Sequence, residues 1–258
     1  MDSVLQHFRK DEQPFIENAI GWIREVENLY VPKLTDFLNP RERYIVETLV
    51  NNSDLLVSKE GAFENAERMR MLIYPNYYVP ELEDYRVTVF SINYPTKFMT
   101  LDHKNVLGSL MGLGIDRSKF GDIHISDEVV QFAVTSELND YMQVNFTAVG
   151  KSKVSISIVE NPEEMIQSKD IWIEATQIVS SMRLDAVIAA LTNFSRQKAA
   201  ALIKSDKVRV NWATENHASA ELFEEDVLSI RGFGRFKVIA IEGRTRKDKI
   251  RLITGHLE

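Results

Sequence analysis

The sequence predicts an α+β protein with three parts in a row: a mainly helical N-terminal domain at residues 1–78, a ferredoxin-like (RRM-like) middle domain at 79–180, and a module of two helices followed by strands at 181–258. Three observations predict this division. Apolar residues recur at helical spacing near the N-terminus, short β-rich runs begin after a proline-containing connection, and positive charge gathers in the last third. At roughly 100–200 residues per domain, 258 residues can form one large domain or a few small ones.

The N-terminal domain begins with an amphipathic helix at residues 14–30, where apolar residues recur every three or four positions with charged residues between them. A second helix is expected to start at Pro40, because Asn39 is a good N-cap and proline is favoured at the first helical position. A short strand is expected at residues 55–57 and a third helix at residues 62–72.

The middle domain follows a connection rich in proline and tyrosine at residues 75–83, which we take as the first domain boundary. The expected order is strand, helix, strand, strand, helix, strand, which is the ferredoxin-like topology that RNA-recognition motifs also use. These elements are expected at residues 85–93, 102–111, 122–125, 129–134, 136–146 and 153–159. The fold alone does not define a function, because it serves many unrelated ones.

The C-terminal module begins near Ser181 with a helix at residues 182–191, and Ser195 is a good N-cap for the next helix. Arg196 and Lys198 lie in the first turn of that helix, where cations oppose the helix dipole. Together with free backbone N–H groups, however, these two cations form a natural phosphate site. Strands are then expected at residues 208–212, 227–231, 236–241 and 250–254.

The net charge of −7 hides a difference between the two parts of the chain. Residues 182–258 hold 14 Lys and Arg against 10 Asp and Glu, a local charge of +4, whereas residues 1–181 hold 17 against 28, a charge of −11. Because Lys and Arg that neutralise phosphates hold polyanions, the module is the part that predicts a nucleic-acid partner. Its candidate RNA-binding residues on one basic face are Ser195, Arg196, Lys198, Lys204, Lys207 and Arg209.

Two later segments are further candidates. In Arg231-Gly232-Phe233-Gly234-Arg235 the glycines permit close backbone approach, while the two arginines and the ring suit a phosphate and a base. The alternative is an ordinary glycine-containing turn. The other segment carries Arg244, Arg246 and Lys247, and an equally good interpretation of it is a charged hairpin that protects a sheet edge from aggregation.

The composition excludes several function classes. The chain has no cysteine, which removes disulfides, thiolate nucleophiles, iron–sulfur clusters and cysteine-rich zinc sites. The five histidines lack a spacing suited to zinc, and the sequence has no phosphate loop, nucleophile elbow or dinucleotide fingerprint. We therefore expect no catalytic residue, no metal and no cofactor, and hence no enzyme. Since no run approaches the roughly 18 apolar residues of a membrane span and the N-terminus lacks a signal-peptide core, we expect a cytoplasmic protein without a membrane partner.

The module resembles a known RNA-binding domain over residues 182–231. Its spaced elements, which include Arg183-Leu184-Asp185, Ser195-Arg196 and Leu202-Ile203-Lys204, look like the domain named after ribosomal protein S-four, also called the αL motif. Arg183, which opens the motif, completes the set of candidate RNA-binding residues. Asp206 and Glu225 stand where the family usually has glycine, so we expect both turns to differ in detail.

A wider resemblance extends over most of the chain from about residue 40. The segments 231–236, 243–247 and 102–114, with Gly121-Asp122-Ile123, look like the YlmH family of bacterial proteins, which are encoded near cell-division genes. The resemblance implies ribosome-associated quality control: binding to a large ribosomal subunit that carries an obstructed peptidyl-tRNA, and assistance to template-free C-terminal tailing of the stalled chain. The implied partners are large-subunit ribosomal RNA, tRNA and quality-control factors.

Two other function classes stay open at this point. Arg183-Leu184-Asp185 also resembles the catalytic tripeptide of pseudouridine synthases, so an RNA-modifying enzyme that uses the αL module to deliver substrate is one alternative. Here the tripeptide opens the RNA-binding module and no catalytic domain follows it, which favours a structural role for Asp185. The other alternative is a cell-division scaffold whose acidic N-terminal two-thirds binds a protein. His103 and Lys104, at an expected helix start, are a further place for RNA contact.

Overall fold

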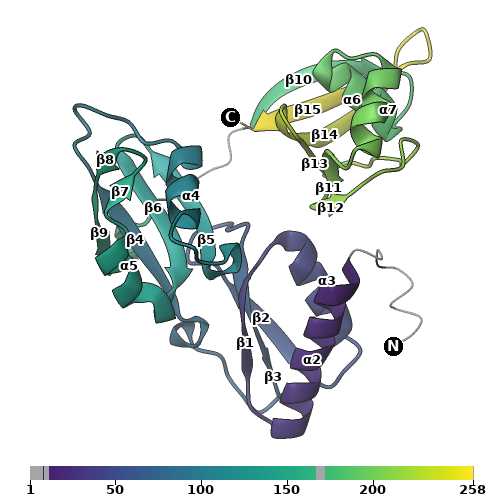
Figure 1. Ribbon diagram of the computed structural model, residues 1–258. Coiled ribbons are helices and arrows are strands. Elements are labelled where there is room, and N and C mark those ends of the chain that lie inside the picture. Colours follow the sequence, from purple (N-terminus) through teal and green to yellow (C-terminus); the bar gives the residue numbers. More distant parts are fainter. Residues whose placement is uncertain (1–7, 9–11, 167–171, 258) are drawn as a thin grey trace. The chain divides into compact units, whose positions relative to one another are not determined.

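The chain divides into two compact units, Met1–Ser168 and Lys169–Glu258, in the computed structural model (Figure 1). The described residues are 8, 12–166 and 172–257. Helices and sheets occur in both units, which confirms the α+β class. Within the described ranges, no helix is both long and apolar enough to cross a membrane.

Two of the three expected N-terminal helices are confirmed. Helix α2 (Gln13–Leu29) buries Ile16, Ala19, Ile23 and Val26 along one face, as its apolar spacing predicts. Helix α3 (Pro40–Val50) begins with a capping box, because the Glu42 N–H donates to Asn39 Oδ1 at 3.0 Å and the Asn39 N–H donates to Glu42 Oε2 at 2.7 Å.

The helix expected at residues 62–72 is wrong. These residues form turns and then strand β3 (Met69–Tyr74), the central strand of an antiparallel sheet in the order β1-β3-β2, with β1 (Lys33–Leu38) and β2 (Leu56–Glu60) at its edges. Helices α2 and α3 cover one face of β3, and Tyr85 packs on the other (Figure 1). Because β3 is buried on both faces, its apolar residues follow one another without alternation, a pattern that does not distinguish a strand from a buried helix. Strand β1 was not predicted.

The ferredoxin-like topology of the middle part is confirmed. Its sheet has the order β5-β6-β4-β9, all neighbours are antiparallel, and two helices connect the strands in the expected places. A small hairpin of β7 and β8 precedes β9. The elements are β4 (Val87–Asn93), α4 (His103–Met111), β5 (Phe120–Ser126), β6 (Val129–Thr135), α5 (Asn139–Asn145), β7 (Ala148–Val149), β8 (Ser152–Lys153) and β9 (Ser155–Ile158).

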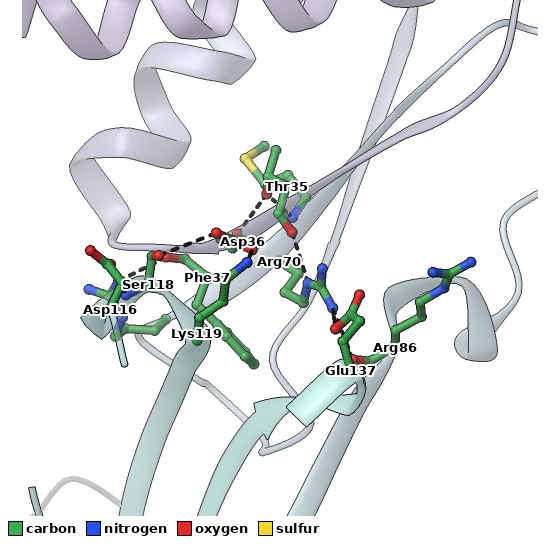
Figure 2. A network of polar contacts seen from close by, with 11 residues as sticks. Thr35, Asp36, Phe37, Arg70, Arg86, Asp116, Ser118, Lys119 and Glu137 are labelled. Atoms are coloured by element: carbon green, nitrogen blue, oxygen red, sulfur yellow. Dashed lines mark hydrogen bonds and ion pairs between the residues drawn. The ribbon is translucent and has the colours of Figure 1, made fainter. Parts of the chain in front are cut away.

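A buried junction joins the N-terminal and middle parts within the first unit. The Arg70 side chain, 4% exposed, donates to the carbonyls of Thr35 at 2.8 Å and Arg86 at 2.9 Å, and its guanidinium lies 3.4 Å from Glu137. Figure 2 shows these contacts, together with Lys119 Nζ at 2.6 Å from Asp36 Oδ1. Burial lowers the pKa of Arg70, although Glu137 opposes the shift.

Gly121 and Asp122, part of the family-like pattern, have structural roles at this junction. A Cβ on Gly121 would lie 2.8 Å from the Phe37 ring, so only glycine allows this close approach. The Asp122 carboxylate accepts the backbone N–H groups of Glu67 at 2.6 Å and Arg68 at 3.2 Å. Both residues therefore fix the N-terminal part against the sheet of the middle part.

The second unit is a six-stranded sheet with two helices packed on it. Its strand order is β10-β15-β14-β13-β11-β12. The elements are β10 (Trp172–Val179), α6 (Leu184–Thr192), α7 (Arg196–Lys204), β11 (Val208–Val210), β12 (Ala213–Thr214), β13 (Val227–Ile230), β14 (Gly234–Arg244) and β15 (Ile250–Leu257). Strand β10 precedes the boundary expected near Ser181, yet it pairs with β15 along its whole length.

Both turns that lack the usual glycine have an unusual backbone. Asp206 has φ 54° and Glu225 has φ 73°, in the left-handed region that glycine adopts readily. Each side chain there costs about 1 kcal/mol relative to glycine. The sequence thus departs from the family pattern while the backbone keeps the conformation that glycine would take.

Candidate nucleic-acid interface

The start of α7 is the centre of the candidate interface. Asn193, with φ 56°, ends α6 in the left-handed conformation and turns the chain into α7. The Ser195 hydroxyl then accepts the Lys198 N–H at 3.3 Å, which confirms Ser195 as the N-cap. Ala199 and Ile203 are buried on the inner side of α7, while Arg196 and Lys198 are exposed on its outer side.

Asp185 joins two of the predicted RNA-binding arginines. Arg183 Nε and Nη2 donate to its carboxylate at 3.2 and 3.1 Å, and Arg196 Nη2 lies 2.9 Å from both carboxylate oxygens. Burial alone would raise the pKa of Asp185, but the hydrogen bonds from Arg183 and Arg196 outweigh it and hold the pKa below the usual range. The carboxylate cancels one of the two positive charges and fixes the direction of both guanidinium groups. Asp185 is engaged in positioning, which gives the pseudouridine-synthase alternative no support.

An aromatic pair connects the start of α7 to the glycine-containing turn at 231–235. The Lys198 ammonium lies 5.5 Å from the centre of the Phe194 ring, and the Phe194 ring meets Phe233 edge to face at 5.3 Å. The turn therefore lies against the same region as Arg196 and Lys198. Because Phe233 is half-buried in this contact, the ring serves packing rather than an open platform for a base.

Strands β11, β13 and β14 carry two further cations on the face of their sheet that is turned away from α6 and α7. Arg209, Ser229 and Arg235 are directly opposite one another across the three strands, so their side chains share one face of the sheet. Their sequence neighbours Val208 and Ile230 point into the core. Arg231 follows at the end of β13, where its N–H donates to the Lys207 carbonyl at 2.9 Å.

Glycine is required in the turn that carries Arg231 and Arg235. Gly232 and Gly234 have φ values of 90° and 96°, and a Cβ on Gly234 would lie 2.9 Å from His256 Nε2. The segment therefore forms a glycine-containing turn. It brings Arg231 and Arg235 back to the region of Lys207 and Arg209.

The structure does not bring the last three candidates to this place. Arg244 ends β14, and Arg246 and Lys247 lie in the following turn, ten residue steps along β14 from Gly234. At about 3.3 Å per residue, that distance is roughly 30 Å. The Arg244 guanidinium also lies 2.9 Å from Asp248. Any RNA contact at this hairpin is a separate one.

The candidate residues thus fall into cations at the starts of α6 and α7 and near the 231–235 turn, cations on the outer face of the sheet, and one distant tip. We define the α7 surface by Arg183, Ser195, Arg196, Lys198, Lys204, Lys207, Arg209, Arg231 and Arg235. Sequence reasoning missed the link that Asp185 makes between Arg183 and Arg196, and it missed the Phe194–Phe233 contact. Cations on a helix and a sheet, all exposed except the half-buried Arg235, with the nearby rings packed away, suit phosphate contact and recognition of the shape of folded RNA. Among the described residues, no three His, Asp or Glu lie together as a metal site would require.

Three family models match the chain in sequence. Residues 11–78 match "YlmH, N-terminal", residues 80–163 match "Putative RNA-binding domain in YlmH", and residues 182–228 match the S4 domain. The last match covers both helices of the α7 surface and the strands β11 and β13 up to Leu228.

Similar proteins agree with these matches. The chain is 42% identical to "Ribosome-associated protein quality control protein P2" of Bacillus subtilis, with 98% of each chain covered. It is 32% identical to the solved structure titled "Cell division protein ylmH from Streptococcus pneumoniae", with a TM-score of 0.55, covering 62% of this chain and 98% of that one. The chain therefore belongs to the YlmH family.

Proposed function

We propose that this protein is a non-enzymatic RNA-binding factor of ribosome-associated quality control in the cytoplasm, which docks on the large ribosomal subunit and on tRNA. The observation that carries the proposal is the α7 surface, in which exposed cations at the starts of α6 and α7 are accompanied by further cations on β11, on β14 and in the 231–235 turn of an S4-type module. The similarity to the Bacillus subtilis quality-control protein supports the process. Within it, the family resemblance points to C-terminal tailing of stalled chains on peptidyl-tRNA.

The proposed mechanism follows from the positive charges of the α7 surface and from the residues that position them. Lysines and arginines of the α7 surface neutralise phosphates, and this electrostatic contact provides affinity without reading a base sequence. Asp185 holds Arg183 and Arg196 in place before RNA arrives, so less side-chain freedom is lost on binding. Folded ribosomal RNA and tRNA present closely spaced phosphates to such a rigid surface, whereas sequence-specific recognition would need exposed rings.

Charge reversal at the start of α7 tests the proposal. Arg196→Glu with Lys198→Glu is expected to abolish co-sedimentation with purified large ribosomal subunits, because it places two negative charges where phosphates bind. The matched variant, Arg246→Glu with Lys247→Glu, makes the same change in net charge at the hairpin tip, roughly 30 Å along β14 from Gly234, and is expected to lose much less binding.

Circular dichroism of both variants checks that they fold. Unchanged co-sedimentation of the α7 variant contradicts the assignment of the site. Equal losses in the two variants would show a general charge effect instead of a defined surface.

A further inference from the structure

The middle domain has a sheet of the kind that RNA-recognition motifs use, and its two central strands are β4 and β6. In those motifs, aromatic side chains on the open face of the sheet stack on RNA bases. Here the aromatic residues of the central strands, Phe90 and Phe132, point to the other face and are fully buried under α4 and α5. Their rings pack on each other at 5.7 Å.

The face without helices is largely covered by other parts of the first unit. Phe37 and Phe63 of the N-terminal part pack on Val89 and Ala133, all of which are at most 5% exposed. The Phe63 ring also lies 4.4 Å from the His124 ring.

The segment before residue 167 covers another part of this face. Gln131, which is 2% exposed, donates to the Glu164 carbonyl at 2.8 Å and accepts the Ile166 N–H at 2.8 Å. The centre of the sheet is thus closed to a base.

The exposed remainder of this face has neither a ring nor a cation among its described residues. It consists of Asn93, Ser126, Val129, Ser155 and Ser157. Serine, asparagine and valine supply neither the stacking surface nor the positive charge that RNA contact uses. An RNA-binding role of this domain therefore requires another surface.

An exposed ring and exposed cations lie instead at the end of the sheet where β4 finishes. The loop after β4 contains Phe98, which at 89% exposure is the most exposed of the described large apolar residues, beside exposed Lys97. A turn closed by the Phe98 N–H and the Pro95 carbonyl, at 3.0 Å, holds the tip of the loop. An exposed ring next to a cation in an ordered turn suits stacking on an unpaired base.

Helix α4 and the β7–β8 hairpin complete this end of the domain. Lys104 lies in the first turn of α4 and is exposed. The hairpin carries Lys151 and Lys153, and its Gly150 N–H donates to the Ser109 hydroxyl of α4 at 3.1 Å, which fixes the hairpin on the helix. Pairing of Asn93 with Ser155 brings the end of β4 and the end of the hairpin together.

The distribution of cations makes this end distinct. Residues 80–163 hold 7 Lys and Arg against 12 Asp and Glu, so the domain as a whole is acidic. Four of those seven cations lie at this one end, and none of the four forms an ion pair with a described carboxylate. By contrast, Lys119 binds Asp36, and Arg117 donates to two backbone carbonyls.

We infer that the middle domain contacts folded RNA through this end, and not through its sheet. The RNA-contacting patch, here called the loop–hairpin patch, consists of Lys97, Phe98, Lys104, Lys151 and Lys153. Its lysines neutralise phosphates and Phe98 stacks on an unpaired base of ribosomal RNA or tRNA. The inference rests on the proposed function, which it deepens by giving the second domain its own RNA surface.

Two full-length triple variants with the same change in net charge test the inference. Lys97→Gln, Lys104→Gln and Lys151→Gln remove three positive charges from the patch, whereas Ser126→Glu, Ser155→Glu and Ser157→Glu add three negative charges to the exposed part of the sheet. The measurement is the affinity for purified large ribosomal subunits as a function of salt concentration. The patch variant is expected to lower the slope of log affinity against log salt by about 2 to 3, at roughly one phosphate per lysine, and the sheet variant is expected to keep the wild-type slope.

A third variant tests stacking by itself. Phe98→Ala removes no charge, so it is expected to weaken binding about tenfold without changing the salt slope. Because Phe98 is almost fully exposed, this change does not disturb the core, and circular dichroism of each variant confirms that it folds.

The outcomes separate the two proposals. If the wild-type protein does not bind large subunits, the proposed function fails and this inference fails with it. If the wild type binds and charge reversal at Arg196 and Lys198 abolishes binding, but the patch variant and Phe98→Ala bind like the wild type, the inference alone is overturned. A loss in the sheet variant that equals or exceeds the loss in the patch variant overturns it as well.

Discussion

The junction inside the first unit and the start of α7 both contain arginine side chains with defined partners. The two places differ in how deeply the guanidinium is buried and in which groups accept its hydrogen bonds. At the junction, Arg70 is 4% exposed and donates to backbone carbonyls of Thr35 and Arg86. At the start of α7, the Arg183 and Arg196 side chains are 44% and 52% exposed and share the carboxylate of Asp185. A buried guanidinium whose Nε and Nη1 donate to backbone carbonyls stabilises a domain contact. An exposed one held by a single carboxylate keeps donors for a phosphate.

Arginine charge by itself is therefore a poor guide to RNA binding in this chain. Burial lowers the pKa of Arg117 to about 10, and its guanidinium donates to the Phe120 and Gly121 carbonyls. Like Arg70, it donates to backbone carbonyls within the first unit and lies outside the α7 surface. The partner of each guanidinium, and not its charge, decides its role.

Removal of Arg70 is expected to have the largest effect on stability. Arg70→Met keeps an unbranched apolar side chain but removes the donors to the Thr35 and Arg86 carbonyls and the ion pair with Glu137, so the free energy of unfolding should fall by about 3 kcal/mol. Urea denaturation of the full-length protein, followed through the transition of the first unit, measures the loss. If the variant is as stable as the wild type, the contacts of Arg70 do not hold the junction.

Asp185→Asn is expected to have a smaller, pH-dependent effect. Because the pKa of Asp185 is lowered in the folded state, the ionised carboxylate stabilises the protein above its ordinary pKa of about 3.9, and this contribution is lost as the pH falls through the lowered value. The wild type should therefore melt at a higher temperature than the variant at neutral pH, and the difference should narrow in acid.

Thermal melting from neutral pH down to about pH 3 measures this difference. A difference that does not depend on pH would show that Asp185 acts by packing and not through its charge on Arg183 and Arg196. That result would also mean that the carboxylate does not hold the two arginines by charge, which is the feature that separates the start of α7 from the junction.

The exposed hairpin tip provides the smallest expected effect. Arg246→Met changes a residue in the turn after β14, away from the core, and is expected to alter the free energy of unfolding by less than about 0.5 kcal/mol. Urea denaturation under the conditions used for Arg70→Met makes the two results comparable. If Arg246→Met lowers the free energy of unfolding about as much as Arg70→Met does, exposure does not distinguish arginines that stabilise the fold from arginines that do not.

Signals that lie close together in the sequence were sufficient for much of the fold. Asn39 with Pro40 and Ser195 with its following turn predicted two helix starts, and the alternation of strand and helix predicted the ferredoxin-like topology. Strand β3 was mistaken for a helix because burial on both faces removes the alternation that marks a strand. Caps and periodicity are local, and a doubly buried strand owes its pattern to neighbours from elsewhere in the chain.

The sequence by itself determined the composition of the candidate interface, since the motif, the charge difference and the glycines of the 231–235 turn are all visible in it. Only the tertiary structure decided how those residues are grouped. It joins Arg183 and Arg196 through Asp185, brings the turn to α7 through Phe194 and Phe233, and leaves the tip of the β14–β15 hairpin far along the strand. It also closes the sheet of the middle domain with Phe37 and Phe63. These contacts depend on strand register and on packing between distant segments, which no spacing along the chain specifies.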